Sequence, residues 1–406
     1  MLPTSQKRKS PSNIKFIFLM ILIGLNLRPA LSSLAPLLPR IENEGTLPVL
    51  TLSLLTALPV LCLGLFAPLA PWLTRQLGIE RSLTIGLIIL SAGLALRGIA
   101  SIFTLYLGTL MLGSAIGIIG TLLPALVKRE LTGSADIITG VYTMALCLGG
   151  ALGAAFSIPI ANLLNSWSLS LFSWSCLALT ALIAWWWIMP QPAAEPQFSP
   201  HKRQARALLN HPLAWQVMLL MGSQSSLAYI VFGWLPTLLV RQGYSESEAG
   251  WLMSISILVQ AISAIAAPWF ARISKDQRPA LLVVFIFIGV GLVMLLLGPT
   301  SLRWPGSILL GLGQGGSFSL ALTLIVLRSG DAKIAGDLSA LAQGGGYTIA
   351  AIGPLIVGLM IDANIGIYKI TWVLLAILGF ATYMALLAGQ QRRLEFNQQG
   401  QLVTIK

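Results

Sequence analysis

The chain has 406 residues, of which 56% are hydrophobic and only 9% are charged. Its mean hydropathy of +0.84 means that it carries more apolar surface than the core of a water-soluble protein could cover. This composition excludes a soluble globular domain. It indicates that lipid is the solvent for most of the chain.

Long apolar segments, each able to cross a bilayer, follow one another along the chain. A crossing needs roughly 20 apolar residues, and Pro and Gly clusters or charge pairs separate the segments. Because lipid cannot satisfy backbone hydrogen bonds and the segments lack the alternation of barrel strands, we expect helices. The sequence predicts an all-α polytopic membrane protein with twelve transmembrane helices, at about residues 15–38, 48–73, 83–101, 105–127, 138–162, 168–189, 214–239, 248–271, 280–298, 305–327, 337–361 and 367–388.

The formal net charge of +12 follows the membrane topology. Most Lys and Arg residues fall in the two tails and in alternate loops, whereas Arg40, Arg241, Arg303 and Lys369 fall on the opposite side. This is the positive-inside pattern, which predicts that both termini face the cytoplasm. We therefore expect the lipid bilayer and a small-molecule substrate as partners, no nucleic acid, and a monomer.

An internal repeat divides the helices into two halves. Residues 70–75, APWLTR, recur 197 residues later as APWFAR at 267–272, and glycines of the fourth and fifth helices recur at nearly the same offset. Repeats of six helices predict two halves with the same topology, related by an axis along the membrane normal. The predicted organisation is an N-terminal tail (1–14), a first half (15–189), a cytoplasmic linker (190–213), a second half (214–389) and a cytoplasmic C-terminal tail (390–406).

Each repeated hexapeptide leads into a short cationic turn. Arg side chains at these turns can bond the last helix carbonyls or anchor the loops in the cytoplasm. The eleventh helix also contains a Gly–Pro pair that could act as a hinge. A gating or structural role is our hypothesis for Arg75, Arg81, Arg272, Arg278, Gly353 and Pro354.

Two charged residues, Arg28 and Arg97, fall well inside apolar segments, with no acidic residue at comparable depth. Such a charge is costly in lipid and normally faces a cavity or a partner. Arg28 precedes Pro29, which should distort the first helix. We expect Arg28 to face the transport cavity, where its planar donors suit a small anion; a link to carbonyls of another helix is the alternative. Arg97 lies nearer a helix end, so we expect it to snorkel to the interface, with a gating role as the alternative.

Other polar side chains at mid-depth are either cavity-lining residues or hydrogen-bond partners between helices. In a duplicated bundle the seventh and tenth helices are the partners of the first and fourth, which favours their polar residues as lining. Besides Arg28, the candidates for substrate binding are Asn26, Gln224, Tyr229, Trp234, Gln314 and Gln343.

Neither paired acids nor clustered histidines appear at one membrane face, so we expect no enzyme, no catalytic residue, no metal site and no cofactor. Cys62, Cys147 and Cys176 lie singly in predicted helices, and His201 and His211 lie in the linker. Because no acid or His lies at mid-depth, a co-transported proton would have to travel with the solute. Facilitative transport is the alternative.

Several segments carry a resemblance to one family. They are LIGLNLRPALSSLAPLLP at 22–39, LLTALPV at 54–60, GWLP at 233–236, GLGQGGSF at 311–318, and IAG at 334–336 followed by Gln343. Together they resemble the major facilitator superfamily permeases that are named for cyanate uptake, and their nitroimidazole-handling relatives. Asn26 and Arg28 fall on the NxRP stretch of that group.

The resemblance implies a major facilitator fold in a bacterial inner membrane. It also implies transport of a small anionic or polar solute that is cyanate-like, nitrate or nitroimidazole-like, by alternating access of the two halves. A multidrug or metabolite exporter of the same fold is the alternative function.

Overall fold

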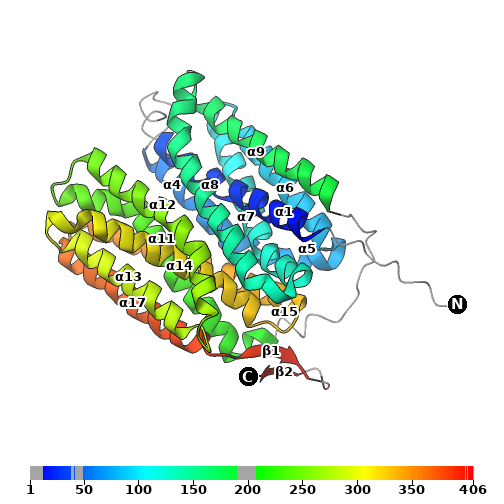
Figure 1. The fold of residues 1–406 in the computed structure, drawn as a ribbon. Coiled ribbons are helices and arrows are strands. Elements are labelled where there is room, and N and C mark those ends of the chain that lie inside the picture. Colours follow the sequence, from blue (N-terminus) through cyan, green and yellow to red (C-terminus); the bar gives the residue numbers. More distant parts are fainter. Residues whose placement is uncertain are drawn as a thin grey trace.

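The computed structural model describes residues 12–37, 41, 49–189, 207–397, 399 and 401–405. Helices make up nearly all of this part of the chain, and Figure 1 shows the first half, coloured blue to green, beside the second, coloured green to red. Expectations about the residues 1–11, Arg40, His201 and most of the predicted linker lie outside the described residues.

The first half begins with a broken helix and continues with long antiparallel helices. Its elements are α1 (Asn13–Leu27), α2 (Pro29–Ser32), η1 (Ala35–Leu37), α4 (Val49–Phe66), α5 (Leu69–Leu77), α6 (Ile79–Leu96), α7 (Ile102–Glu130), η2 (Thr132–Ser134), α8 (Ala135–Leu163) and α9 (Trp167–Ile188).

The second half repeats this order and ends in a small sheet. Its elements are α11 (Pro212–Arg241), α12 (Glu246–Ala271), α13 (Arg278–Leu296), η3 (Thr300–Leu302), α14 (Arg303–Leu327), α15 (Ala332–Ala350), α16 (Ile352–Asp362), α17 (Ile367–Ala388), β1 (Arg393–Phe396) and β2 (Leu402–Ile405).

The prediction of twelve crossings is confirmed. Among the described residues, eleven spans are long and apolar enough to cross a bilayer, with α1 and α2 counted together and α15 and α16 counted together. The twelfth consists of α4 and α5, which bend by 51° at the break between them. Pro68 lies at this break, where its missing N–H removes a helical hydrogen bond.

Large apolar side chains cover the outside of the bundle. Leu163, Trp187 and Trp251 are 81%, 85% and 63% exposed, and many more Leu, Ile and Phe side chains join them. Water-soluble proteins rarely expose contiguous apolar surface of this extent. The exterior is therefore suited to lipid.

The first span is interrupted at Arg28, as Pro29 leads us to expect. α1 ends at Leu27, and Pro29 is the first residue of α2. The segment around the break packs closely against α8. A Cβ on Gly153 would collide with Pro29, and Ser32 Oγ donates a hydrogen bond to the Gly150 carbonyl at 2.8 Å. Glycines of α8 thus hold the broken helix close.

The C-terminal tail folds into a hairpin of the antiparallel strands β1 and β2. Leu394 is fully buried; its N–H donates to the Arg328 carbonyl at 2.8 Å, and its own carbonyl accepts from Gly330 at 2.9 Å. Thr404 Oγ1 lies 2.9 Å from His211 Nε2, just before α11. The hairpin is therefore fastened to the second half, next to α15 in Figure 1.

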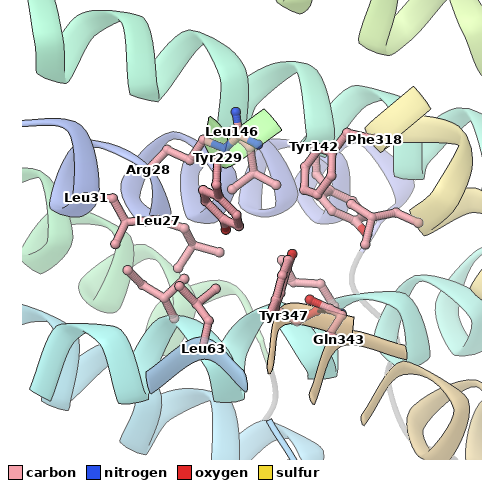
Figure 2. A pocket seen from close by; sticks show the side chains of 14 residues that line it. Leu27, Arg28, Leu31, Leu63, Tyr142, Leu146, Tyr229, Phe318, Gln343 and Tyr347 are labelled. Carbon is pink, nitrogen blue, oxygen red and sulfur yellow. Dashed lines mark hydrogen bonds between the residues drawn. The ribbon is translucent and has the colours of Figure 1, made fainter. Parts of the chain in front are cut away.

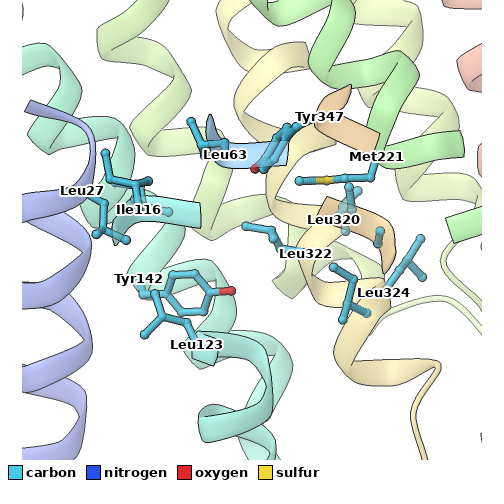
Figure 3. Packing of buried hydrophobic residues seen from close by; sticks show 14 of the residues in the cluster. Leu27, Leu63, Ile116, Leu123, Tyr142, Met221, Leu320, Leu322, Leu324 and Tyr347 are labelled. Atoms are coloured by element: carbon cyan, nitrogen blue, oxygen red, sulfur yellow. The ribbon is translucent and has the colours of Figure 1, made fainter. Parts of the chain in front are cut away.

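One apolar cluster runs through both halves. Figure 3 shows Leu27, Ile116 and Leu123 of the first half together with Leu322 and Tyr347 of the second. The two halves therefore pack against each other through apolar side chains.

Candidate functional site: a cavity between the two halves

A small cavity lies at the break in the first span, between the two halves (Figure 2). Its volume is about 50 Å³, on a scale where a single water needs roughly 10–15 Å³. Leu and Ile side chains are half of the lining residues. The polar and aromatic lining residues are Arg28, Tyr142, Tyr229, Phe318, Gln343 and Tyr347.

Arg28 brings a positive charge to this wall. Its Nη1 donates to Cys147 Sγ at 3.8 Å, and its guanidinium carbon lies 4.8 Å from the centre of the Phe318 ring and 5.9 Å from that of Phe232. Gly150 leaves room for the side-chain stem, which a Cβ there would meet at 3.4 Å. None of the ion pairs between described residues includes Arg28.

The opposite wall is polar and neutral. Gln343 Nε2 donates to the Gly120 carbonyl at 2.9 Å and to Ser339 Oγ at 2.8 Å, so this side chain links the halves while it lines the cavity. The rings of Tyr229 and Tyr347 meet edge to face, with centroids 6.3 Å apart. The cavity thus combines one cation with an amide, tyrosines and aromatic rings.

The structure brings together three of the predicted contact residues, Arg28, Tyr229 and Gln343. Sequence reasoning did not select Tyr142, Phe318 or Tyr347. Tyr347 lies one helical turn after Gln343, a spacing that puts two side chains on the same face and could have revealed it. Tyr142 gives no such signal, because only packing determines which face of α8 meets the cavity.

Asn26 and Gln224 do not line the cavity. Asn26 Nδ2 donates to the Leu22 carbonyl of its own helix at 2.7 Å, and Gln224 Nε2 donates to Ser225 Oγ at 2.7 Å. The amide oxygen of each is buried and has no hydrogen-bond partner among the residues that the structure describes. Their role in substrate binding stays a prediction.

Gln314 and Trp234 also lie away from the lining. Gln314 accepts a hydrogen bond from Gln260 at 3.3 Å, and Trp234 Nε1 donates to the Pro354 carbonyl at 2.9 Å. The second bond joins α11 to α16 just after the break that separates α15 from α16. The break precedes Gly353 and Pro354, and hinging there stays a prediction.

Arg97 corrects an expectation. Its side chain is fully buried, so it does not snorkel to an interface. Its Nε and Nη2 bind Thr109 Oγ1 at 3.2 and 2.8 Å, and Nη1 donates to the Ala30 carbonyl at 2.8 Å. These acceptors satisfy the guanidinium inside the protein, which makes exposure unnecessary. Arg97 ties α6 and α7 to the segment that follows Arg28.

At the end of the bundle that carries Arg75, Arg129, Arg272 and Arg328, here called the basic end, the halves are joined by charge. Nε and Nη2 of Arg272 both donate to the Asp136 carboxylate of the first half. These bonds raise the pKa of Arg272 above its usual value.

Of the two roles considered for these turns, bonding to the carbonyls of its own helix is not what the Arg272 side chain does, because its Nε and Nη2 bond Asp136. Arg278 instead pairs with Asp276 at 2.7 Å. Arg75 acts electrostatically on Asp337 of the other half, and Arg81 is exposed near the start of α6. Metal chemistry finds no support in the described part of the chain, where no group of three His, Cys, Asp or Glu residues could hold an ion.

Residues 17–354 match the family model of the Major Facilitator Superfamily. The chain belongs to the Major Facilitator Superfamily. It is 36% identical over 348 residues to the 2-nitroimidazole transporter of Escherichia coli (strain K12), and the aligned region covers 85% of this chain and 87% of that protein. It is 32% identical over 359 residues to the cyanate transport protein CynX of the same organism, and that aligned region covers 88% of this chain and 92% of that protein.

The fold of this Major Facilitator transporter is also that of a solved structure. The proton:xylose symporter XylE bound to 6-bromo-6-deoxy-D-glucose matches with a TM-score of 0.77, covering 92% of this chain and 94% of that chain. At 12% identity, this likeness concerns the fold alone. The predicted family and fold are confirmed, and the chain is a multi-pass membrane transporter. In transporters built from repeats, substrate sites lie at the repeat interface, and the cavity here is lined by residues of both halves.

Proposed function

We propose that this transporter moves a small, electron-rich polar or anionic solute across the inner membrane, with Arg28 as the main contact. The solute is cyanate, nitrate or a nitroaromatic compound such as a nitroimidazole. The two halves rock about the cavity so that it opens to each side in turn. The protein works as a monomer with the basic end in the cytoplasm.

The observation that carries this proposal is the guanidinium of Arg28, which lies on the wall of a cavity between the halves and has no ion-pair partner among the described residues. An Arg inside a membrane span usually has a carboxylate partner or compensating carbonyls, because its charge is costly away from water, and Arg28 is half-buried there. Arg28 has instead a thiol, two aromatic rings and the cavity. A solute oxygen could take the place of the missing partner, since the guanidinium fork matches planar oxyanions.

The rest of the wall favours a small, flat solute. Only a few water volumes are free in the cavity, so a compound with few atoms fits with the least rearrangement. Tyr229 and Tyr347 supply aromatic surface and hydroxyl groups, and no described acidic residue lines the wall to attract an amine. Two relatives named for 2-nitroimidazole and cyanate transport support the same class of solute.

The charge of the solute decides whether uptake needs an energy source. Bringing one negative charge inward against about 100 mV costs about 2.3 kcal/mol, whereas a neutral nitroaromatic meets no such barrier. The cavity wall offers no carboxylate or imidazole as a proton carrier. We propose that any proton enters bound to the solute, and that a neutral solute crosses without coupling.

The test is uptake of radiolabelled cyanate and 2-nitroimidazole into proteoliposomes that contain the purified protein, with and without a pH gradient. We expect uptake of at least one solute by the native protein, and a loss of more than tenfold in Arg28→Ala. Arg28→Lys should retain part of the activity, because it keeps the charge but not the planar fork. Lys369→Ala removes an exposed cation far from the cavity and is the matched control.

Two results would contradict the proposal. Equal flux by Arg28→Ala and the native protein would remove Arg28 from the site, and the absence of flux for both solutes would refute the substrate class. Efflux from preloaded intact cells, without uptake, would favour the exporter.

A further inference from the structure

The proposed site leaves open how Arg28 is held, since its charge lacks an acidic partner among the described residues. A long, flexible side chain without a partner samples many rotamers, and ordering it on binding weakens affinity. The structure nevertheless gives the guanidinium well-defined neighbours. Phe318 and Phe232 lie at 4.8 and 5.9 Å from its central carbon, within the roughly 6 Å range of cation–π attraction.

From this geometry we infer that Phe318, assisted by Phe232, is a positioning residue that orients the Arg28 guanidinium for the solute. The inference rests on the proposed function. A guanidinium attracts an aromatic ring through its flat face and donates hydrogen bonds from its edge. The Phe318 ring, whose centre lies 4.8 Å from the guanidinium carbon, stabilises the cation and offers no oxygen acceptor, so N–H groups stay available for a solute. One N–H of Nη1 meets Cys147, so the second N–H of Nη1 and those of Nε and Nη2 remain for the solute.

The side chains around the Arg28 guanidinium come from both halves of the protein. In the first half, Arg28 lies at the break after α1, and Cys147 and Gly150 lie on α8. In the second half, Phe232 lies on α11 and Phe318 on α14. Phe318 itself lines the cavity beside Tyr142 (Figure 2). The oriented guanidinium therefore exists only while the halves are packed as they are here. Rocking separates the rings from the cation and weakens the grip on the solute, which favours its release.

The test separates affinity from maximal rate in proteoliposome uptake. Phe318→Leu keeps an apolar side chain of similar size but removes the aromatic face. We expect KM to rise about 3- to 10-fold, the range expected from losing one cation–π contact, with maximal rate changed less than about twofold. Phe318→Tyr and Phe318→Trp keep the face and should stay within about twofold of the native KM.

Phe380→Leu is the matched control, because this ring lies on the exposed surface of α17. If Phe318 were merely structural, Phe318→Leu would lower the amount of folded protein and the maximal rate. The aromatic variant Phe318→Tyr would then show no selective return of KM to its native value. If Phe318→Leu does not fold, the single variants Phe232→Leu and Phe318→Tyr replace it in the comparison. The KM of Phe232→Leu should then rise, by less than is expected for Phe318→Leu, while that of Phe318→Tyr stays near the native value.

Failure of this inference is distinguishable from failure of the proposed function. If Arg28→Ala abolishes uptake but Phe318→Leu leaves KM unchanged, Arg28 binds the solute without help from the rings, and only the inference is overturned. If Arg28→Ala transports normally, the proposed function falls first. In Arg28→Lys, whose ammonium lacks a planar face, Phe318→Leu should change KM less than it does beside Arg28.

Discussion

Asp136 and Arg272 lie 136 residues apart in the chain, yet they form a two-pronged ion pair that joins the halves at the basic end. Asp136 opens α8 and Arg272 follows α12. The pair can exist only while this end is closed, so its loss should favour the form that is open there. Because the Arg272 side chain is 45% exposed, we expect the pair to contribute about 0.2–1 kcal/mol.

Asp136→Asn and Arg272→Ala should therefore shift the ratio of closed to open forms about 1.5- to 5-fold. Distances between spin labels at Gly133 and Lys275, both exposed at this end, measure the shift. The reversed pair, Asp136→Arg with Arg272→Asp, should restore the short distance. Native distances and native transport in both single variants would rule out a gating role.

Arg97 holds the segment that follows Arg28 through hydrogen bonds to Ala30 and Thr109. Arg97→Ala should lower stability by about 2–4 kcal/mol, because it removes three hydrogen bonds and leaves a cavity. Thr109→Val should cost less, since Arg97 keeps its bond to Ala30. Thermal unfolding in detergent, followed by tryptophan fluorescence, measures both variants. A melting temperature of Arg97→Ala equal to that of the native protein would show that the buried guanidinium contributes nothing net.

The repeat places Gln277 of the second half where the first half has Glu80, at the offset of 197. Glu80 accepts from Arg129 at 2.8 Å, whereas Arg328 donates to the neutral Gln277 amide. Burial, followed by repulsion from Arg392, lowers the pKa of Arg328 to about 10.

Gln277→Glu should supply the missing negative charge, raise the pKa of Arg328 and increase stability by about 1 kcal/mol. Glu80→Gln should have the opposite effect in the first half. The melting temperatures of the two variants, measured side by side in detergent, check this. A lower melting temperature for Gln277→Glu would mean that desolvation of the new carboxylate outweighs its attraction to Arg328.

His211 makes the hairpin and the start of α11 sensitive to pH. Its Nδ1 accepts from the Leu213 N–H at 3.2 Å, so Nε2 carries the proton and donates to Thr404. Burial, together with the nearby Arg392, lowers the pKa of His211. The folded protein therefore favours the neutral ring, and the stability that this contributes is present above about pH 6.5 and is lost as pH falls through the lower, folded pKa.

The melting temperature of the native protein should thus fall as pH drops below about 6.5. His211→Asn keeps a side-chain acceptor at this helix start without a titrating ring. Its melting temperature should depend less on pH between 8 and 5. Parallel curves for the native protein and His211→Asn would show that another group governs the pH dependence.

The sequence by itself determined the solvent, the number of crossings and the two halves. Hydropathy is a local, additive property, and a duplicated segment such as APWLTR is visible without coordinates. Arg28 was also visible, because a charge within an apolar segment stands out wherever the helices finally pack. The family resemblance rested on the same local stretches, and the comparisons confirmed it.

Only the tertiary structure decided which side chains share the cavity. These helices are apolar on nearly every face, so hydropathy does not set their rotation. Close packing does, as where Gly153 of α8 meets Pro29. That packing turned Tyr142 and Phe318 into the cavity that Arg28 also lines, whereas the Asn26 side chain bonds its own helix. Likewise, the partners of Arg97 and Arg272 lie far from them in sequence, and a contact of that kind exists only once the helices are brought together.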